Sequence, residues 1–74
     1  MFKVTAGHLI RLRRTLFGKS SPWVYGTIIR QDESGLIHYR TWKDKRLHTM
    51  ASVDAGWMHD RGDLQTRPPN KERR

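Results

Sequence analysis

Residues 21–42 read SPWVYGTIIRQDESGLIHYRTW, and this stretch decides the fold. Two runs rich in Val, Ile, Thr, Tyr and Trp flank the tetrad Asp-Glu-Ser-Gly at residues 32–35. β-branched and aromatic residues suit a pleated sheet, and the tetrad supplies turn formers that end in a glycine able to adopt positive φ. The pattern therefore predicts an antiparallel hairpin of residues 23–31 and 36–42.

The register of this hairpin predicts two chemically different faces. If Gln31 lies opposite Leu36, alternate side chains fall on opposite sides of the hairpin. The first face, which we interpret as core, pairs Ile28 with Tyr39 and Arg30 with Ile37, and also carries Val24, Gly26 and Thr41. The second face mixes aromatic and basic groups and pairs Tyr25 with Trp42, Thr27 with Arg40 and Ile29 with His38. A one-residue bulge would exchange part of this assignment.

Length and composition limit the class of protein. A chain of 74 residues forms one small domain at most, and without cysteine it has no disulfide or thiolate metal site. No apolar run approaches the roughly 20 residues that cross a bilayer. The first residues, MFKVTAGH, lack the apolar block of a signal peptide. These features predict a soluble, cytoplasmic protein.

The charge predicts the kind of partner. The formal net charge is +8, a large positive field for so small a chain. Such a field favours polyanions, with nucleic acid first, acidic protein surfaces second and anionic lipid third.

The N-terminal segment from Gly7 to Arg14 has two competing interpretations. Apolar and charged residues alternate there, which favours a strand with one charged face. The alternative is a basic amphipathic helix over residues 5–17, as in a helix-turn-helix repressor, capped by Thr5 and ended by Gly18. We prefer the strand because a polar loop and a strong hairpin follow it.

The remaining segments complete a mainly β prediction. Residues 15–22 are expected to form a loop in which Leu16 and Phe17 fold back as a lid on the core. Residues 46–52 alternate in character and predict a further strand, and residues 53–58 a short turn that places Trp57 against the open end of a barrel. From residue 59 apolar residues are so scarce that we expect residues 59–74 to be a disordered basic tail. The folded domain would then span residues 1–58.

Three phrases carry a family resemblance: GHLIRL at residues 7–12, YGTII at 25–29 and GLIHY at 35–39. Together with the order strand, loop, hairpin, strand and short turn, they resemble SH3-like small barrels of four to five strands over residues 3–58. The likeness is to KOW and Tudor-type modules and, more loosely, to plasmid-encoded dihydrofolate reductases. The KOW resemblance implies binding to RNA or RNA polymerase. The reductase activity is not supported, because the strand that would line the catalytic pore reads RLHTM at residues 46–50.

Candidate catalytic and metal-ligating residues are few. The four histidines, His8, His38, His48 and His59, are not paired at i, i+4 spacing, and no cysteine completes a zinc set. No nucleophile has a base and an orienting group close to it in the sequence pattern. We therefore expect a protein that is not an enzyme and has neither metal nor cofactor.

Basic residues and aromatic rings are the candidate binding residues. The N-terminal third contains five cations and no acid, so these charges repel one another unless a partner neutralises them. Rings close to Arg40 could stack on bases. The predicted partner-binding residues are Lys3, Arg11, Arg13, Arg14, Lys19, Tyr25, His38, Arg40, Trp42, Lys43, Lys45 and Arg46.

The sequence thus predicts a monomeric binding module that acts on nucleic acid, RNA more than DNA, or on a machine such as RNA polymerase or the ribosome. Its size and charge suit a phage-encoded transcription regulator that contacts RNA polymerase and RNA. Two alternatives stay open. One is an adaptor or inhibitor that docks on an acidic protein surface, and the other is a DNA-binding repressor, which requires residues 5–17 to be helical. No membrane partner is expected.

Overall fold

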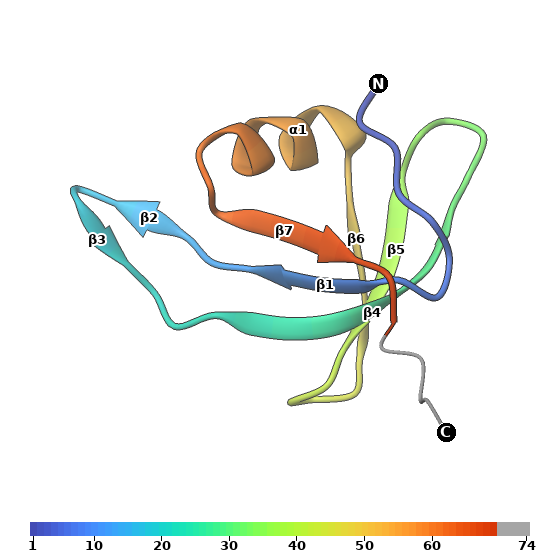
Figure 1. Ribbon diagram of the computed structural model, residues 1–74, viewed down its shortest axis with the longest axis horizontal. Coiled ribbons are helices and arrows are strands. Elements are labelled where there is room, and N and C mark those ends of the chain that lie inside the picture. The colour runs from blue at the N-terminus through green and yellow to red at the C-terminus, as the bar shows by residue number, and fades with distance from the viewer. Residues whose placement is uncertain (70–74) are drawn as a thin grey trace.

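The computed structural model describes residues 1–69 and is mainly β, as predicted. Seven strands and one helix follow one another along the chain (Figure 1). Their bounds are β1 Leu9–Leu12, β2 Thr15–Leu16, β3 Lys19–Ser20, β4 Val24–Gln31, β5 Ile37–Thr41, β6 Leu47–Met50, α1 Ser52–Asp60 and β7 Leu64–Arg67. No helix within residues 1–69 has both the length and the apolar character needed to span a membrane.

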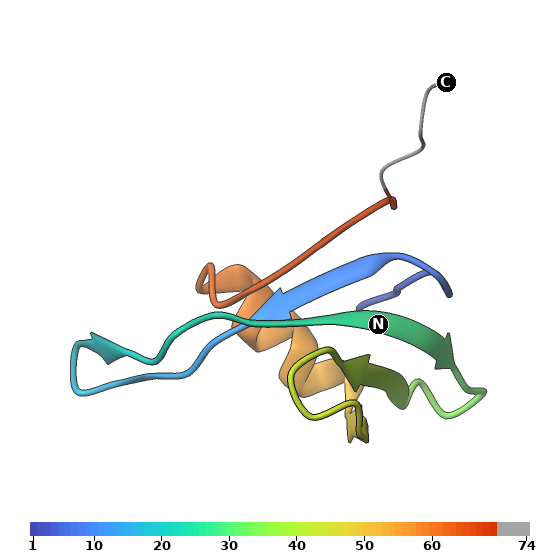
Figure 2. The same cartoon turned by 90° about the horizontal axis from the view of Figure 1, so that it is seen from below.

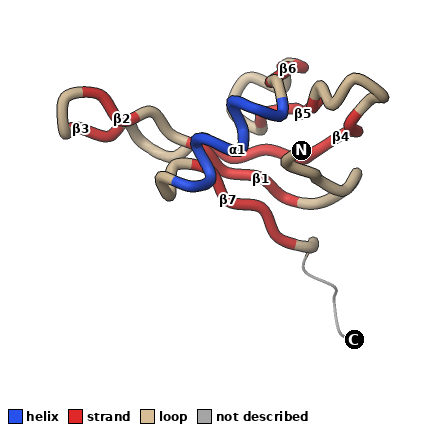
Figure 3. Tube along the Cα trace, turned by 90° about the horizontal axis from the view of Figure 1, so that it is seen from above, coloured by secondary structure: helices blue, strands red, loops and turns tan. Residues whose placement is uncertain are grey.

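Five strands form one antiparallel sheet in the order β6-β5-β4-β1-β7. Helix α1 lies across one side of this sheet, and the segment before β1 runs beside it (Figures 1 and 3). The edge strands β6 and β7 are not paired with each other among the described residues, so the sheet is open and does not close into the expected barrel. Because β1 is a strand that pairs with β4 on one side and β7 on the other, the helical interpretation of residues 5–17 is wrong.

The core lies between the sheet and α1. Ile28 and Tyr39 are opposed across β4 and β5 and both are buried, as the hairpin register predicted. Ile37 is also buried. The rest of the core cluster comes from the flanking strands and the helix: Ile10, Ala55 and Leu64. Three of these side chains, Ile28, Ile37 and Leu64, are fully enclosed.

The predicted register is correct only up to Ile28. A β-bulge follows, so that Arg30 lies opposite His38 and Gln31 opposite Ile37, and the predicted pair of Arg30 with Ile37 is wrong. The bulge brings the amide of Gln31 to the N-terminal segment. There its Oε1 accepts from the Val4 amide at 2.9 Å, and its Nε2 donates to the carbonyl of Phe2, also at 2.9 Å. The extra residue thus turns an arginine away from the core and ties down the chain start.

The expected disordered tail and the domain boundary at residue 58 are also wrong for the described residues. Helix α1 runs through that boundary to Asp60, and β7 pairs with β1 along its whole length. Leu64 contributes its side chain to the core at 1% exposure, because Leu12 is its partner on β1 and places it on the helix side of the sheet. Residues 70–74 of the predicted tail lie outside the described residues.

Strands β2 and β3 form a separate two-stranded hairpin that projects from the sheet (Figures 1 and 2). We call residues 15–20 the wing. The expected lid is wrong, because Leu16 is 66% exposed and Phe17, at the wing tip, is completely exposed. Thr15 lies opposite Ser20 and Leu16 opposite Lys19, which leaves Phe17 and Gly18 as a two-residue turn that carries Phe17 away from the core.

Candidate functional site

The sheet face that points away from α1 carries a mixture of rings and cations. We call it the open face, and Figure 2 views the sheet from the side opposite α1. Its position follows from the register: Ile10 and Leu64 point into the core, so their alternate neighbours on β1 and β7 point outward. The open face comprises Leu9, Arg11, Trp23, Tyr25, Thr27, Arg40, Trp42, Gln65 and Arg67.

Tyr25 and Trp42 form the aromatic centre of the open face. Their ring centroids are 6.1 Å apart and the rings are inclined by 20°, so they lie nearly parallel. The indole nitrogen of Trp42 donates to the hydroxyl of Thr27 at 2.9 Å, which fixes the orientation of the indole. Tyr25 is 45% and Trp42 is 50% exposed, so these oriented rings remain available to a ligand.

A third ring, Trp23, gathers two positive charges on the same face. The guanidinium carbons of Arg11 and Arg13 lie 4.2 and 4.4 Å from its ring centroid. Cation–π contacts of this kind favour a guanidinium over an indole. They gather Arg11 and Arg13 around one indole, and Arg11, which forms no ion pair among the described residues, is the group of the two that can bind an anion.

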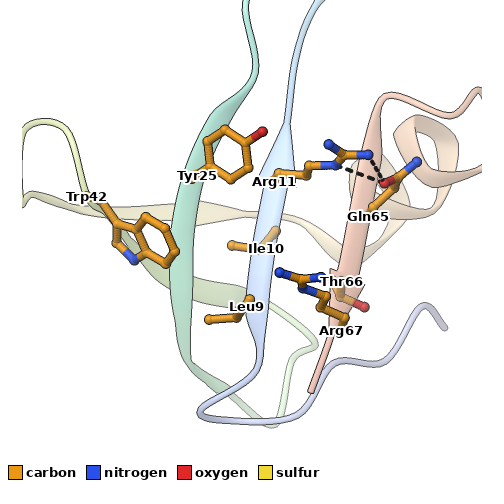
Figure 4. A pocket seen from close by; sticks show the side chains of 8 residues that line it. All are labelled: Leu9, Ile10, Arg11, Tyr25, Trp42, Gln65, Thr66 and Arg67. Atoms are coloured by element: carbon orange, nitrogen blue, oxygen red, sulfur yellow. Dashed lines mark hydrogen bonds between the residues drawn. The ribbon is translucent and has the colours of Figure 1, made fainter. Parts of the chain in front are cut away.

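A groove of about 410 Å³ runs between the aromatic centre and β7 (Figure 4). Leu9, Arg11, Tyr25, Trp42 and the β7 residues Gln65, Thr66 and Arg67 are among the residues that line it. The side-chain oxygen of Gln65 accepts from Nε and Nη2 of Arg11 at 2.8 and 2.5 Å. The groove thus combines flat rings, an amide and two guanidinium groups within one concave surface.

The positive charge of the open face is only partly balanced by acids. Among the described residues, Arg11, Arg40 and Arg67 form no ion pair, and the bonded partners of Arg11 and Arg40 are a neutral amide and a backbone carbonyl. Arg13 differs, because its Nε lies 3.1 Å from Oδ1 of Asp63. Three cations therefore keep their full charge toward solvent.

Asp63 connects the wing with the sheet. Its buried carboxylate accepts from Arg13 and from the hydroxyl of Thr15 at 3.0 Å, and Arg61 lies 3.4 Å away. Burial acts to raise the pKa of Asp63, but the bonds from Arg13 and Thr15 and the charge of Arg61 outweigh it, so the pKa lies below its ordinary value. Asp63 is thus a structural anion that positions the base of the wing.

Four of the sequence-predicted binding residues, Arg11, Tyr25, Arg40 and Trp42, meet on the open face. Arg13 also lies there but is paired with Asp63. Three others are elsewhere. Arg14 follows β1 on the opposite side, where it lines a groove with Tyr39 and Arg61. Lys19 is on the wing, and Lys3 is in the segment before β1.

His38 lies beside an acid of the turn before β5, and the basic cluster after β5 lies in a turn that contains a second acid. His38 lies 3.1 Å from Asp32, and hydrogen bonds from Ser34 and His38 hold the pKa of that carboxyl well below its usual range. Lys43, Lys45 and Arg46 lie in the turn between β5 and β6, and none of their side chains forms an ion pair among the described residues. The hydroxyl of Thr41 and the amide of Arg46 donate to Asp44 and lower its pKa to about 2. Each of these two acids is thus held by hydrogen bonds from its own turn and the strand beside it.

Sequence reasoning missed Trp23, Gln65 and Arg67 as site residues. Trp23 lies two residues before Tyr25, and alternate residues of a strand point to the same side. The alternation could therefore have placed Trp23 on the open face. Gln65 and Arg67 had no usable signal, because the segment around them reads as an unstructured tail until β1 supplies its pairing partner.

The described residues contain no group of three His, Asp or Glu side chains arranged to hold a metal ion. Comparison with protein-family models, with curated proteins and with solved structures found no significant match to the chain. The candidate site therefore stands on its own geometry and charge.

Proposed function

We propose that the protein is a non-enzymatic module that binds single-stranded nucleic acid on the open face. The observation that carries the proposal is the exposed, nearly parallel pair of Tyr25 and Trp42 beside the unbalanced guanidinium groups of Arg11 and Arg67. Rings stack on bases, and guanidinium groups bind phosphates, often through two hydrogen bonds at once.

Single strands fit the open face better than duplexes. Stacking on Tyr25 or Trp42 needs a free base surface, whereas in a duplex each base already stacks on its neighbours. A duplex would offer mainly its phosphates, so that only the electrostatic part of the interaction would remain. The side-chain NH₂ of Gln65 in the groove adds a donor that an unpaired base edge can use, whereas its oxygen already accepts from Arg11.

The role in transcription and the contact with RNA polymerase rest on size and charge alone and stay predictions. So does the preference for RNA over DNA. The open face supports the more general step, an electrostatic and stacking contact with an unpaired polynucleotide.

The proposal is tested by fluorescence anisotropy of labelled single-stranded RNA, single-stranded DNA and duplex DNA over a range of salt concentrations. Two variants remove the same charge from opposite sides of the sheet: Arg11→Gln on the open face and Arg14→Gln on the helix side. Arg11→Gln should weaken single-strand binding and flatten the salt dependence by about one phosphate contact, since each contact releases counterions. Arg14→Gln should have the smaller effect on both.

Two results would contradict the proposal. One is equal loss of affinity in the two variants, which would mean that only net charge matters. The other is a duplex bound as tightly as the single strands at every salt concentration, which would remove the role of the rings.

A further inference from the structure

We propose that Phe17 at the wing tip is a second stacking contact for the same polynucleotide and binds a base beyond the open face. The inference rests on the proposed function and extends the site along the long axis of the molecule. Its evidence is the exposure and backbone strain of Phe17, the anchoring of the wing, and the line of rings that leads to it.

Phe17 makes no visible contribution to folding. Its side chain is fully exposed, whereas a phenylalanine in a small domain is normally a major part of the core. Its φ is +52°, in the left-handed region that is unfavourable for a bulky residue, and Gly18 follows at +76°. Positive φ at both central residues is the signature of a type I′ turn, where Asn-Gly is the favoured pair. A large ring thus occupies a position where turn chemistry favours a small polar residue.

The wing that carries this ring is held at its base. The hydroxyl groups of Thr15 and Ser20 lie 2.9 Å apart, and Thr15 also bonds to the buried Asp63. Across the neck of the wing, the amide of Ser21 donates to the carbonyl of Arg14 at 2.8 Å. Because these hydrogen bonds hold the base of the hairpin, the position of its tip relative to the sheet is defined.

The position of the wing identifies its partner as the polynucleotide of the open face. Strands β1 and β4 lead from the open face directly into β2 and β3 (Figures 1 and 2). Along this ribbon Trp42 and Tyr25 are followed by Trp23 with its two guanidinium groups, and then by Phe17. The first 31 residues, which include β1, the whole wing and β4, contain no acid, and the carboxylate bonded to the base of the wing, Asp63, is buried and paired with Arg13. An apolar ring at the end of such a path suits a base.

The test measures affinity against oligonucleotide length, with single strands of about 4 to 16 nucleotides, a range that covers known sites on small β domains. The wild type is compared with Phe17→Ala and Phe17→Asn. The control is Trp57→Ala, because Trp57 is a 70% exposed ring on α1, away from the open face. Thermal unfolding of each variant is recorded in parallel.

We expect the affinity of the wild type to increase with oligonucleotide length by more than the added phosphate charge explains. This extra increase in affinity is the gain with length. Phe17→Ala and Phe17→Asn should reduce this gain by about 5- to 100-fold, the range for one base stacked on a ring, and leave binding of the shortest strands unchanged. Their salt dependence should stay as in the wild type, since no charge is removed. Phe17→Asn should also raise the thermal midpoint by about 2–6 °C, because Asn tolerates this turn.

The opposite outcomes overturn the inference. If both Phe17 variants keep the full gain with length, or lose no more than Trp57→Ala, the tip does not contact a base. A midpoint that falls in both variants would show that Phe17 packs against the fold in solution, which also excludes the proposed role. Absence of binding at every length would instead contradict the proposed function itself.

Discussion

The two faces of the five-stranded sheet are built from alternate residues of the same strands, yet they serve different purposes. On β4, Ile28 is buried at 1% exposure under α1, while Tyr25, on the other side of the same strand, is 45% exposed. On β1, Ile10 is in the core and its neighbour Arg11 lines the groove. The alternation separates stability from recognition, so substitutions on one face should affect folding and those on the other should affect binding.

The largest effect should come from removing β7, which serves both faces at once. A chain that ends after Asp63 loses the enclosed Leu64 and the whole β1–β7 ladder, and should fail to fold or lose most of its stability. A chain that ends after Pro69 keeps β7 and should melt as the full-length protein does. Circular dichroism melts of the two truncations decide the matter, and equal melting of both would mean that β7 is dispensable.

Neighbouring isoleucines on β4 sharpen the comparison between faces. Ile28→Ala should lower the free energy of unfolding by about 2–4 kcal/mol, since it opens a cavity in the core. Ile29→Ala, at a position that is 41% exposed, should cost less than about 1 kcal/mol. Urea unfolding of both variants gives the two values, and similar losses would show that the faces are not separated as described.

Substitutions of the rings on the open face should affect binding and leave folding intact. Tyr25→Ala or Trp42→Ala should each cost about 1–3 kcal/mol of affinity for single-stranded oligonucleotides. Their thermal midpoints should stay close to that of the wild type, because both side chains are about half exposed. A variant with a lowered thermal midpoint that still binds the oligonucleotide with wild-type affinity below that midpoint would contradict this. Its ring would then stabilise the fold and would not contact the ligand.

The smallest effect concerns the acid that braces the wing. The pKa of Asp63 lies below its ordinary value of 3.8 in the folded state. Its ion pairs therefore stabilise the fold fully above the unfolded pKa, and this stabilisation is lost as the pH falls through the folded value. Asp63→Asn should be less stable than the wild type at neutral pH, and the difference should shrink below about pH 4. Asp60→Asn, at an exposed carboxylate, is the control in urea titrations at several pH values.

Local patterns in the sequence predicted the central hairpin and the core pair of Ile28 with Tyr39, because turn chemistry and alternation act over a few residues. A one-residue bulge was allowed for, but its place after Ile28 and the bonds of Gln31 to the distant N-terminal segment have no local signal in the hairpin pattern. Strand β7 was missed for the same reason: a segment with one aliphatic residue becomes a strand only when β1 lies beside it.

The candidate site was partly predictable. Tyr25, Arg40 and Trp42 were placed on one face by the hairpin alone, and the structure puts them there. The groove needed β7, so Gln65 and Arg67 could not be found. The exposure of Phe17 contradicted the expected lid, because the sequence does not show that residues 17 and 18 form a two-residue turn between paired strands.

The most direct test of the open face uses the three indole N–H signals of the protein. Trp23 and Trp42 lie on the open face and Trp57 lies on α1, so a heteronuclear NMR titration with a single-stranded oligonucleotide reports both sides of the molecule in one experiment. We predict that the signals of Trp23 and Trp42 shift progressively while that of Trp57 stays in place. Shifts confined to Trp57, or no shift of any indole at a saturating concentration, would contradict binding on the open face.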